Sequence, residues 1–199
     1  MQLYKYWKMC RRARGDGVNS PCLSVDLLSD NDYGYLCNEF DTTYIVIDGT
    51  SNFREWLENM AWFRVGKTKE AKGFKNVAVE MYEQIAENTP IRNNVVLTGH
   101  SRGGAVALSL GLMLLHRGYK VKDVITFGAP KLGGKLFCDA SRDAGLNHTR
   151  VVMRGEVVAK LPFFRGKHYE TNLIVINNDI DNIVEKHLSY GAYLKGGLA

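Results

Sequence analysis

The sequence predicts one α/β domain with a mostly parallel central sheet flanked by helices. Its 199 residues are 45% hydrophobic and 24% charged, which is typical of a single soluble globular domain. Short apolar runs rich in β-branched residues alternate with longer stretches of helical periodicity, as in repeated β-α units. No run of 18 apolar residues occurs, so the pattern does not favour a membrane-spanning helix.

Five short apolar runs are the predicted strands. Each is rich in β-branched or aromatic residues and is bounded by turn-forming residues, which is typical of a buried strand. The first clear one is Tyr44–Ile47, and the others follow at Val95–Thr98, Val124–Phe127, Val151–Met153 and Leu173–Ile176.

Two helices are predicted between these strands. Apolar residues from Phe74 to Ile85 recur at the spacing of one helix face, and this helix is expected to end near Asn88, before Thr89-Pro90. A second helix is expected over residues 102–116, where Gly118 ends it. Its apolar residues cover nearly the whole circumference, which predicts that it lies inside the core.

The charges are distributed unevenly along the chain. The net charge is +5, yet residues 1–14 hold five bases and no acid, while residues 15–53 hold seven acids and no Lys or Arg. The basic head either docks on an anionic membrane surface or folds back onto the acidic stretch. We favour the second, because opposite charges adjacent in one chain need no partner. No nucleic-acid-binding motif is present.

The four cysteines show no Cys-x-x-Cys pair and no cluster with histidines, so no structural metal site is expected. A chain of this length does not need disulfides to hold a core, and unpaired cysteines suit a reducing compartment. Residues 1–15 lack the apolar run of a secretory signal, so a cytoplasmic location is predicted, with export by another route left open.

The segment Gly99-His-Ser-Arg-Gly-Gly104 lies between a predicted strand and the apolar helix. Gly-x-Ser-x-Gly at such a junction is the nucleophile elbow of α/β-hydrolases, in which a serine occupies a strained tight turn. A base and an acid are then needed, in the chain order Ser, Asp/Glu, His. The candidate bases are His148, His168 and His187, and Glu156 follows a late strand as a candidate acid.

Several ordered blocks accompany the elbow. They are Val46-Ile-Asp-Gly-Thr-Ser-Asn-Phe-Arg-Glu-Trp56, Lys72-Gly-Phe74, Thr126-Phe-Gly-Ala-Pro-Lys-Leu-Gly133, Arg150-Val-Val-Met-Arg-Gly-Glu-Val-Val-Ala-Lys-Leu-Pro162 and His187-Leu-Ser-Tyr190. In this order they resemble the fungal-type (class 3) lipases of the α/β-hydrolase superfamily, over about residues 44–194. We therefore expect an N-terminal region, 1–43, that packs on or is appended to a catalytic domain, 44–199.

The resemblance implies roles for particular residues. Ser101 becomes the nucleophile, Glu156 the acid and His187 the base, while Thr50 and Arg102 supply the oxyanion hole. Ser51 is an alternative to Thr50 in that hole. Among the other histidines, His168 matches a family position outside the triad and is expected to be a structural support. His100 is expected to pack beside the elbow, and His116 and His148 to lie at a helix end and in a loop.

Four positions depart from the family pattern, and one of them is Ala71, which stands where the family often has His. Glu156 stands where the family normally has Asp, and Asp179 and Asp181 are the alternative acids. Asp48 replaces a usual Arg beside the oxyanion residues. Arg102 replaces a usual Leu; its side chain either selects a negatively charged group on the substrate, or lies on the surface or pairs with an acid.

The segment after the oxyanion strand is short and amphipathic. Its apolar residues at helical spacing include Phe53, Trp56, Leu57 and Met60. It is predicted to be a lid whose apolar face covers the substrate pocket, and the alternative is a helix packed on the core.

These features predict a serine hydrolase that cleaves lipid or other carboxylic esters, such as acylglycerols, through an acyl-serine intermediate, with no metal or organic cofactor. One alternative is phospholipase, thioesterase or acyltransferase chemistry on the same triad. The other is a non-catalytic binding module with a lipase-like fold, which the departures at Asp48, Arg102 and Glu156 keep open.

Overall fold

A computed structural model describes residues 2–13, 24–29, 32–49, 64–65, 67–88, 91–162 and 166–195. Its main sheet has seven strands in the order β1-β2-β3-β6-β7-β8-β9. These strands are β1 (Ser24–Ser29), β2 (Asp32–Glu39), β3 (Thr42–Ile47), β6 (Asn94–His100), β7 (Val121–Phe127), β8 (His148–Met153) and β9 (Asn172–Ile176). Strands β3 and β6 to β9 pair in parallel, and β1 and β2 join them as an antiparallel meander. The predicted mostly parallel sheet is confirmed.

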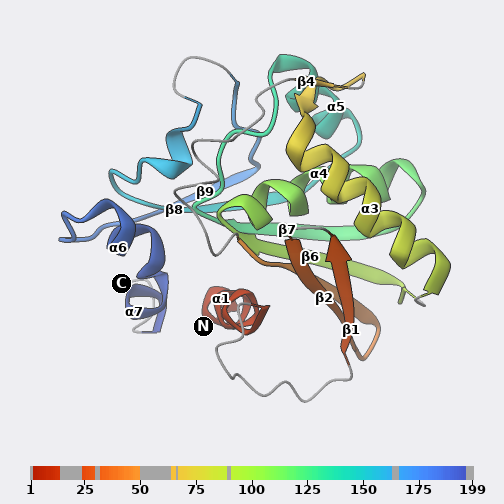
Figure 1. Cartoon of the computed structure of the whole chain (residues 1–199), viewed down its shortest axis with the longest axis horizontal. Helices are drawn as coiled ribbons and strands as arrows, with labels where there is room; N and C mark the ends of the chain where they lie inside the picture. The colour runs from red at the N-terminus through yellow and green to blue at the C-terminus, as the bar shows by residue number, and fades with distance from the viewer. Residues whose placement is uncertain are drawn as a thin grey trace.

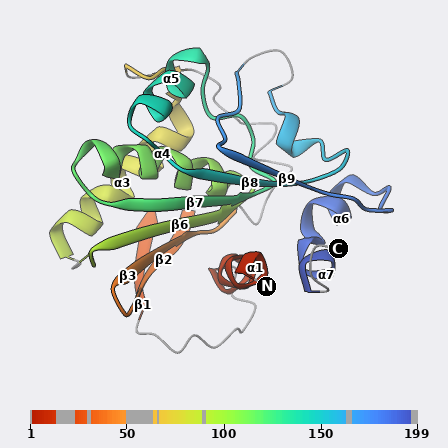
Figure 2. The same cartoon turned by 180° about the vertical axis from the view of Figure 1, so that it is seen from behind.

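Helices cover both faces of this sheet. Figures 1 and 2 show α3 and α4 on one side and α1 on the other, with α6 and α7 beside α1. The helices are α1 (Gln2–Ala13), α3 (Lys72–Asn88), α4 (Arg102–His116), α5 (Lys135–Asp143), α6 (Ile183–Leu188) and α7 (Tyr190–Lys195), together with the short 3-10 helix η1 (Val158–Lys160). A separate two-stranded sheet joins β4 (Arg64–Val65) to β5 (Glu70–Ala71).

Two apolar cores form because successive strand residues point to opposite faces of the sheet. Under α3, α4 and α5, the core gathers Phe74, Met81 and Leu110 against Ile45 and Leu97. On the other face, α1 and α7 pack against different strand residues, which include Val46, Val96, Phe127, Val151 and Met153. The nearly continuous apolar surface predicted for residues 102–116 is explained, because α4 is buried along almost its whole length.

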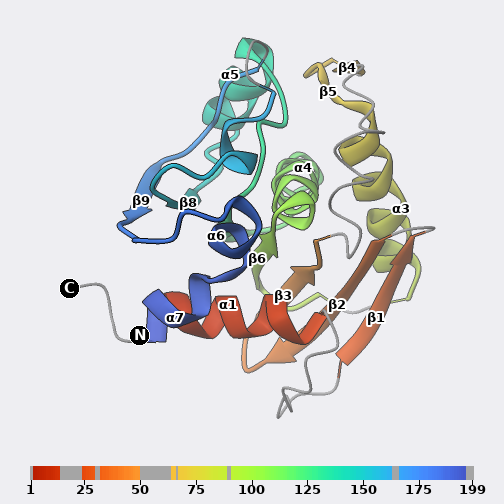
Figure 3. The same cartoon turned by 60° about the vertical axis from the view of Figure 1, so that its left-hand side comes forward.

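Helix α1 folds back onto the acidic stretch, as we expected of the basic head. Lys5 Nζ lies 2.7 Å from Glu39 Oε2, and the Arg12 guanidinium lies over the Tyr35 ring. The apolar side of the same helix buries Trp7 and Cys10 against the sheet. Figure 3 shows α1 and α7 side by side, so the first and last described helices lie next to each other.

The first fifty residues contain one confirmed strand and one wrong expectation. Tyr44–Ile47 lies within β3, and β1 and β2 precede it. The wrong expectation concerns the cysteines: Cys37 is disulfide-bonded, whereas Cys10 and Cys138 form no disulfide. Because disulfides persist mainly in oxidising compartments, the argument for a reducing compartment fails at Cys37. Within the described residues, no helix is long and apolar enough to cross a membrane.

His148 is a buried strand residue and not a loop residue, which corrects the expectation for this position. Its Nε2 lies 2.9 Å from Thr126 Oγ1, and its Nδ1 is hydrogen-bonded to the Tyr169 carbonyl oxygen. Burial, together with the nearby Arg150 charge, lowers the pKa of His148 to about 4, although the Tyr169 bond opposes this change. The imidazole is therefore neutral in the folded protein at neutral pH.

This buried imidazole predicts loss of stability in mild acid. The unfolded chain protonates His148 below its ordinary pKa of 6.5, whereas the folded protein does so only near pH 4. The stabilisation is therefore complete above pH 6.5 and is lost as the pH falls towards 4, by about 3 kcal/mol. Urea unfolding at pH 7 and pH 4.5 measures it. His148→Gln should reduce the loss of unfolding free energy between pH 7 and pH 4.5, and His116→Gln, at an exposed position, should not. An equal loss in the two variants would refute the assignment.

Candidate active site

Ser101 occupies a strained turn between β6 and α4. Its backbone has φ 55° and ψ −126°, a region that non-glycine residues rarely adopt. The turn is held by the Ser101 N–H, which donates to the Phe127 carbonyl at 2.8 Å. The residue is buried, with 1% of its surface exposed. This strand-turn-helix arrangement matches the elbow that the Gly-x-Ser-x-Gly pattern predicts.

A glycine two residues later brings α4 against the end of β3. A Cβ at Gly103 would lie 2.3 Å from the carbonyl oxygens of both Ile47 and Asp48, so only glycine permits this approach. Arg102 is the first residue of α4. Its N–H belongs to the first turn, where backbone N–H groups have no acceptor within the helix. A donor of this kind, next to Ser101, suits a developing oxyanion.

His187 lies on α6 and is almost fully buried, with 3% exposed. The helix begins at Asn182, whose side chain accepts hydrogen bonds from the N–H groups of Val184 and Glu185. His187 Nδ1 is hydrogen-bonded to Glu156 Oε1. A buried carboxylate at Nδ1 fixes the ring orientation, so Nε2 is the nitrogen left for proton transfer.

Glu156 is held at both carboxylate oxygens. It lies in the turn after β8, and its Oε2 accepts the Met153 N–H at 3.1 Å and the Tyr190 hydroxyl. Burial, and then the neighbouring carboxylate, raise the pKa of Tyr190 well above its ordinary value, so the phenol keeps its proton and donates. These contacts accommodate a glutamate where the family pattern has the shorter aspartate. The sequence analysis gave Tyr190 no role of its own, although this residue ends the His187-Leu-Ser-Tyr190 block.

His100 packs behind the pair, as its position in the elbow suggested. Its ring centroid lies 4.4 Å from that of His187, and its Nε2 lies 2.9 Å from the His187 carbonyl oxygen. Trp7 of α1 contacts His100 edge-on at 5.1 Å between centroids and Tyr190 at 5.2 Å. The N-terminal helix therefore contacts the layer of aromatic and imidazole rings that supports His187.

Some of the remaining predicted site residues are described by the structure, and others lie outside its described part. Among the described residues, the Ser101 hydroxyl makes no hydrogen bond, so its contact with a base is not part of this conformation. Asp181, an alternative acid, is exposed, and Glu156 holds the position next to His187. The other predicted residues lie outside the described part of the chain: Thr50, Ser51, Phe53, Trp56, Leu57 and Met60.

The sequence is similar to those of known proteins. The sequence pattern of the lipase (class 3) family matches residues 44–166, which is more than half of the chain. The chain belongs to the class 3 lipase family. A lipase from Rhizopus niveus is 30% identical over 155 residues, covering 69% of this chain and 39% of the relative. The phospholipase A1 PLIP1 of Arabidopsis thaliana is 29% identical over 147 residues, covering 63% of this chain and 22% of the relative.

Solved structures show the same fold. The Lip2 lipase of Yarrowia lipolytica has a TM-score of 0.71 at 21% identity, covering 88% of this chain and 77% of that one. The triacylglyceride lipase of Rhizomucor miehei has a TM-score of 0.69 at 22% identity, covering 87% and 78%. The predicted α/β-hydrolase fold is therefore confirmed, while the chain spans less than half the length of the curated relatives it matches.

The Thr126-Phe-Gly block of the lipase family has a clear role here. Gly128 has φ 58°, and a Cβ on it would lie 2.2 Å from Glu156 Oε1 and 3.0 Å from His187 Nδ1. Gly128→Ala should therefore displace the pair. A displacement of about 1 Å at a reacting group typically lowers the rate about 100-fold, so we expect that loss in kcat/KM for a nitrophenyl ester.

Gly118→Ala is the matched control. Gly118 also has a positive φ, of 85°, but a Cβ there would meet no atom within 4 Å. Both variants carry the backbone strain of about 1 kcal/mol that alanine suffers in this region, so urea unfolding should show both as destabilised. Only Gly128→Ala should lose activity, and wild-type kinetics in that variant would contradict the proposed Glu156–His187 site.

His168 supports the loop that follows the acid, as expected for this position of the lipase pattern. Its Nε2 lies 2.6 Å from the Ala159 carbonyl oxygen in η1 and 2.9 Å from Arg150 Nη2. Arg150 Nη2 also donates to the Ala159 carbonyl, at 3.1 Å. Burial, and then the Arg150 charge, lower the pKa of His168 to about 3, so the ring is a neutral structural group.

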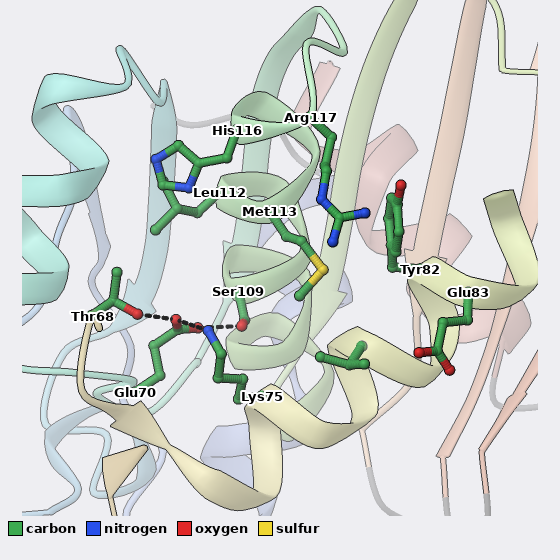
Figure 4. Close-up of a pocket in the computed structure, with 11 residues that line it drawn as sticks. Thr68, Glu70, Lys75, Tyr82, Glu83, Ser109, Leu112, Met113, His116 and Arg117 are labelled. Atoms are coloured by element: carbon green, nitrogen blue, oxygen red, sulfur yellow. Dashed lines mark hydrogen bonds and ion pairs between the residues drawn. The ribbon is translucent and has the colours of Figure 1, made fainter. Parts of the chain in front are cut away.

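A pocket of about 560 Å³ lies between α3 and α4, away from this site (Figure 4). Glu70, 2% exposed, lies at its inner end. Its carboxylate accepts hydrogen bonds from the hydroxyls of Ser109 and Thr68. It also forms an ion pair with Lys75, whose Nζ lies 2.7 Å from Glu70 Oε1. Because a buried carboxylate needs partners of this kind, we interpret the cluster as an anchor that ties β5 to α3 and α4.

Proposed function

We propose that the chain hydrolyses carboxylic esters of lipids, such as acylglycerols, through an acyl-serine intermediate. The observation that carries the proposal is the buried contact of His187 with Glu156, which follows β8 of the sheet whose strand β6 leads into the strained Ser101 turn. With His187 Nε2 brought to the Ser101 hydroxyl, these residues would supply the nucleophile, base and orienting acid used for acyl transfer.

Each residue has a defined role in the proposed reaction, and His187 acts first as base and then as acid. His187 Nε2 takes the proton from Ser101 as the hydroxyl oxygen attacks the ester carbonyl carbon. Glu156 stabilises the resulting imidazolium, and the N–H of Arg102 binds the oxyanion together with Thr50. The alcohol leaves with the proton from His187. Water then attacks the acyl-serine by the same steps and releases the carboxylic acid.

The comparisons suggest lipid esters as substrates. The matched relatives include proteins named lipase and phospholipase A1. Acylglycerol hydrolysis is our first candidate, and phospholipid deacylation is the second because of those phospholipase A1 relatives. The predicted lid residues Phe53, Trp56, Leu57 and Met60 would favour such substrates by presenting an apolar surface.

Two further predictions concern where the protein acts. A cytoplasmic location stays a prediction, and the disulfide at Cys37 weighs against it. Docking of the basic helix on an anionic membrane also stays a prediction. The contacts of Lys5 with Glu39 and of Arg12 with Tyr35 oppose it, since those bases are already engaged.

Covalent labelling tests the proposed chemistry directly. A fluorescent alkyl phosphonate should modify the folded protein, and peptide mass spectrometry should find the adduct on Ser101. Release of fatty acid from a triacylglycerol, a diacyl phospholipid and an acyl thioester should then rank the substrates. A folded protein that neither reacts with the phosphonate nor cleaves any of the three would support the non-catalytic alternative.

A further inference from the structure

A second pocket lies behind the loop that carries Glu156. It has a volume of about 340 Å³, within the range of small-ligand sites. It opens between β8, β9 and η1, and we call it the β8–β9 groove. The side chains that matter for its chemistry are those of Arg150, Val152, Arg154, Ala159, Lys160 and Val175.

Most of this groove lies on the opposite face of the sheet from His187, although Met153 and Glu156, which also line it, belong to the layer that holds His187. Val151 and Met153 of β8 point into the core under α1 and α7, together with Tyr190. Because side chains alternate along a strand, Arg150 and Val152 point to the other face. Val175 is the register partner of Val152 on β9 and lies on that same face. A ligand in the groove would therefore be separate from the ester at Ser101.

The walls of the groove are aliphatic and incompletely covered. Val152, Ala159 and Val175 supply them. On β9, Leu173 and Val175 are 47% and 45% exposed, although they lie on the face that the larger helices cover elsewhere in the sheet. An aliphatic chain laid along this edge would remove apolar surface from water, which is favourable.

The charged groups around the groove are mainly cationic. Arg154 and Lys160 lie at its exposed side, and Arg150, only 8% exposed, lies inside. Glu156 is the acid that also lines it, but its oxygens are engaged by His187, Met153 and Tyr190. Glu170 approaches Arg150 from outside the groove, at 3.8 Å. The groove therefore favours an anion.

Arg150 also has a hydrogen-bond donor without an acceptor among the described residues. Its Nη2 is hydrogen-bonded to the Ala159 carbonyl, but within the described residues its buried Nε–H has no hydrogen-bond partner. Leaving a buried charged donor unsatisfied costs free energy. Glu170 Oε2, 3.8 Å from Arg150 Nη1, is likewise without a hydrogen-bond partner within the described residues, so a ligand carboxylate that reached the guanidinium would supply an acceptor that Glu170 does not. A carboxylate is a good acceptor for a guanidinium.

We propose that the β8–β9 groove binds the anion of an aliphatic carboxylic acid. Its carboxylate lies among Arg150, Arg154 and Lys160, and its chain runs along Val152 and Val175. Such a ligand has the chemistry of the acid released by ester hydrolysis. That connection rests on the proposed function, whereas the binding itself does not.

The test measures binding of decanoate, below its micelle concentration, by calorimetry. All proteins carry Ser101→Ala, so neither turnover nor an active nucleophile is needed. Arg154→Glu combined with Lys160→Glu should weaken binding at least about tenfold, since two attractions become repulsions. Val175→Glu should weaken it as well. Lys122→Glu, which changes an exposed base on β7 outside the groove, is the matched control and should bind as the parent does.

Decanol, which has the same chain and no charge, should bind the parent at least about tenfold more weakly than decanoate because it forms no ion pairs. Equal decanoate affinity in the groove variants and in Lys122→Glu would overturn the proposal, as would equal affinity for decanol and decanoate. These outcomes are independent of the phosphonate result, so failure of the groove and failure of the ester hydrolase are distinguished.

Discussion

Replacing Ser101 by alanine is expected to lower kcat for a nitrophenyl ester by about 10⁴- to 10⁶-fold, because the acyl-serine intermediate can no longer form. Residual activity would come from substrate binding and the oxyanion donors alone. The hydroxyl makes no hydrogen bond among the described residues, so its removal should hardly change the urea midpoint. Steady-state kinetics and urea unfolding on the same preparation measure both effects.

Ser189→Ala is the control for this experiment. Ser189 lies directly after α6, and its hydroxyl donates to the Glu185 carbonyl at 2.7 Å, so the variant removes a serine hydroxyl close to His187. Its kcat should remain near that of the wild type. If Ser101→Ala kept wild-type activity in a folded protein, the assignment of the nucleophile would be wrong.

Replacing Glu156 by glutamine is expected to lower kcat by about 10⁴-fold. The amide retains the size of the carboxylate but loses the charge that stabilises imidazolium at His187, and it disturbs the tautomer set through Nδ1. Tyr190 would also lose its charged acceptor. Measuring kcat from pH 5 to pH 9 would show whether the loss is the same at every pH or is confined to the acidic or the alkaline side of the profile.

Glu156→Asp tests whether the rate depends on the position of the carboxylate that contacts His187. It keeps the charge and restores the residue that the lipase pattern usually has, but it withdraws the carboxylate by one methylene. A displacement of about 1 Å costs about 100-fold in rate, so we expect a loss of that order, intermediate between wild type and glutamine. An aspartate variant as slow as the glutamine variant would show that position, and not charge, controls the rate.

The centre of the parallel sheet was predictable because its strands are buried on both faces and read as nearly continuous apolar runs. All seven residues of β6 are buried, and α4 follows at once. Strand β2 gave no such signal, since Gly34 and polar residues interrupt it. It forms because its backbone pairs with β3, where Leu36 lies opposite Ile45. Pairing of this kind depends on tertiary context and not on propensity.

The candidate site was predictable where chemistry imposes a local pattern. Ser101 was found through the glycines of its turn, and Glu156 and His187 through ordered blocks. Tyr190 and Trp7 could not be assigned in the same way, because an aromatic residue at helical spacing is usually just core. Their contacts with Glu156 and His100 depend on how α7 and α1 pack side by side on one face of the sheet.

The packing of α1 also has a practical use in spectroscopy. Trp7 is one of three tryptophans in the chain, and its indole lies against His100, Phe127 and Tyr190. Indole fluorescence responds to nearby imidazole rings and to polarity. With Trp56 and Trp62 replaced by phenylalanine, the emission of Trp7 would be an intrinsic optical signal from the rings that support His187, readable during turnover without an attached dye.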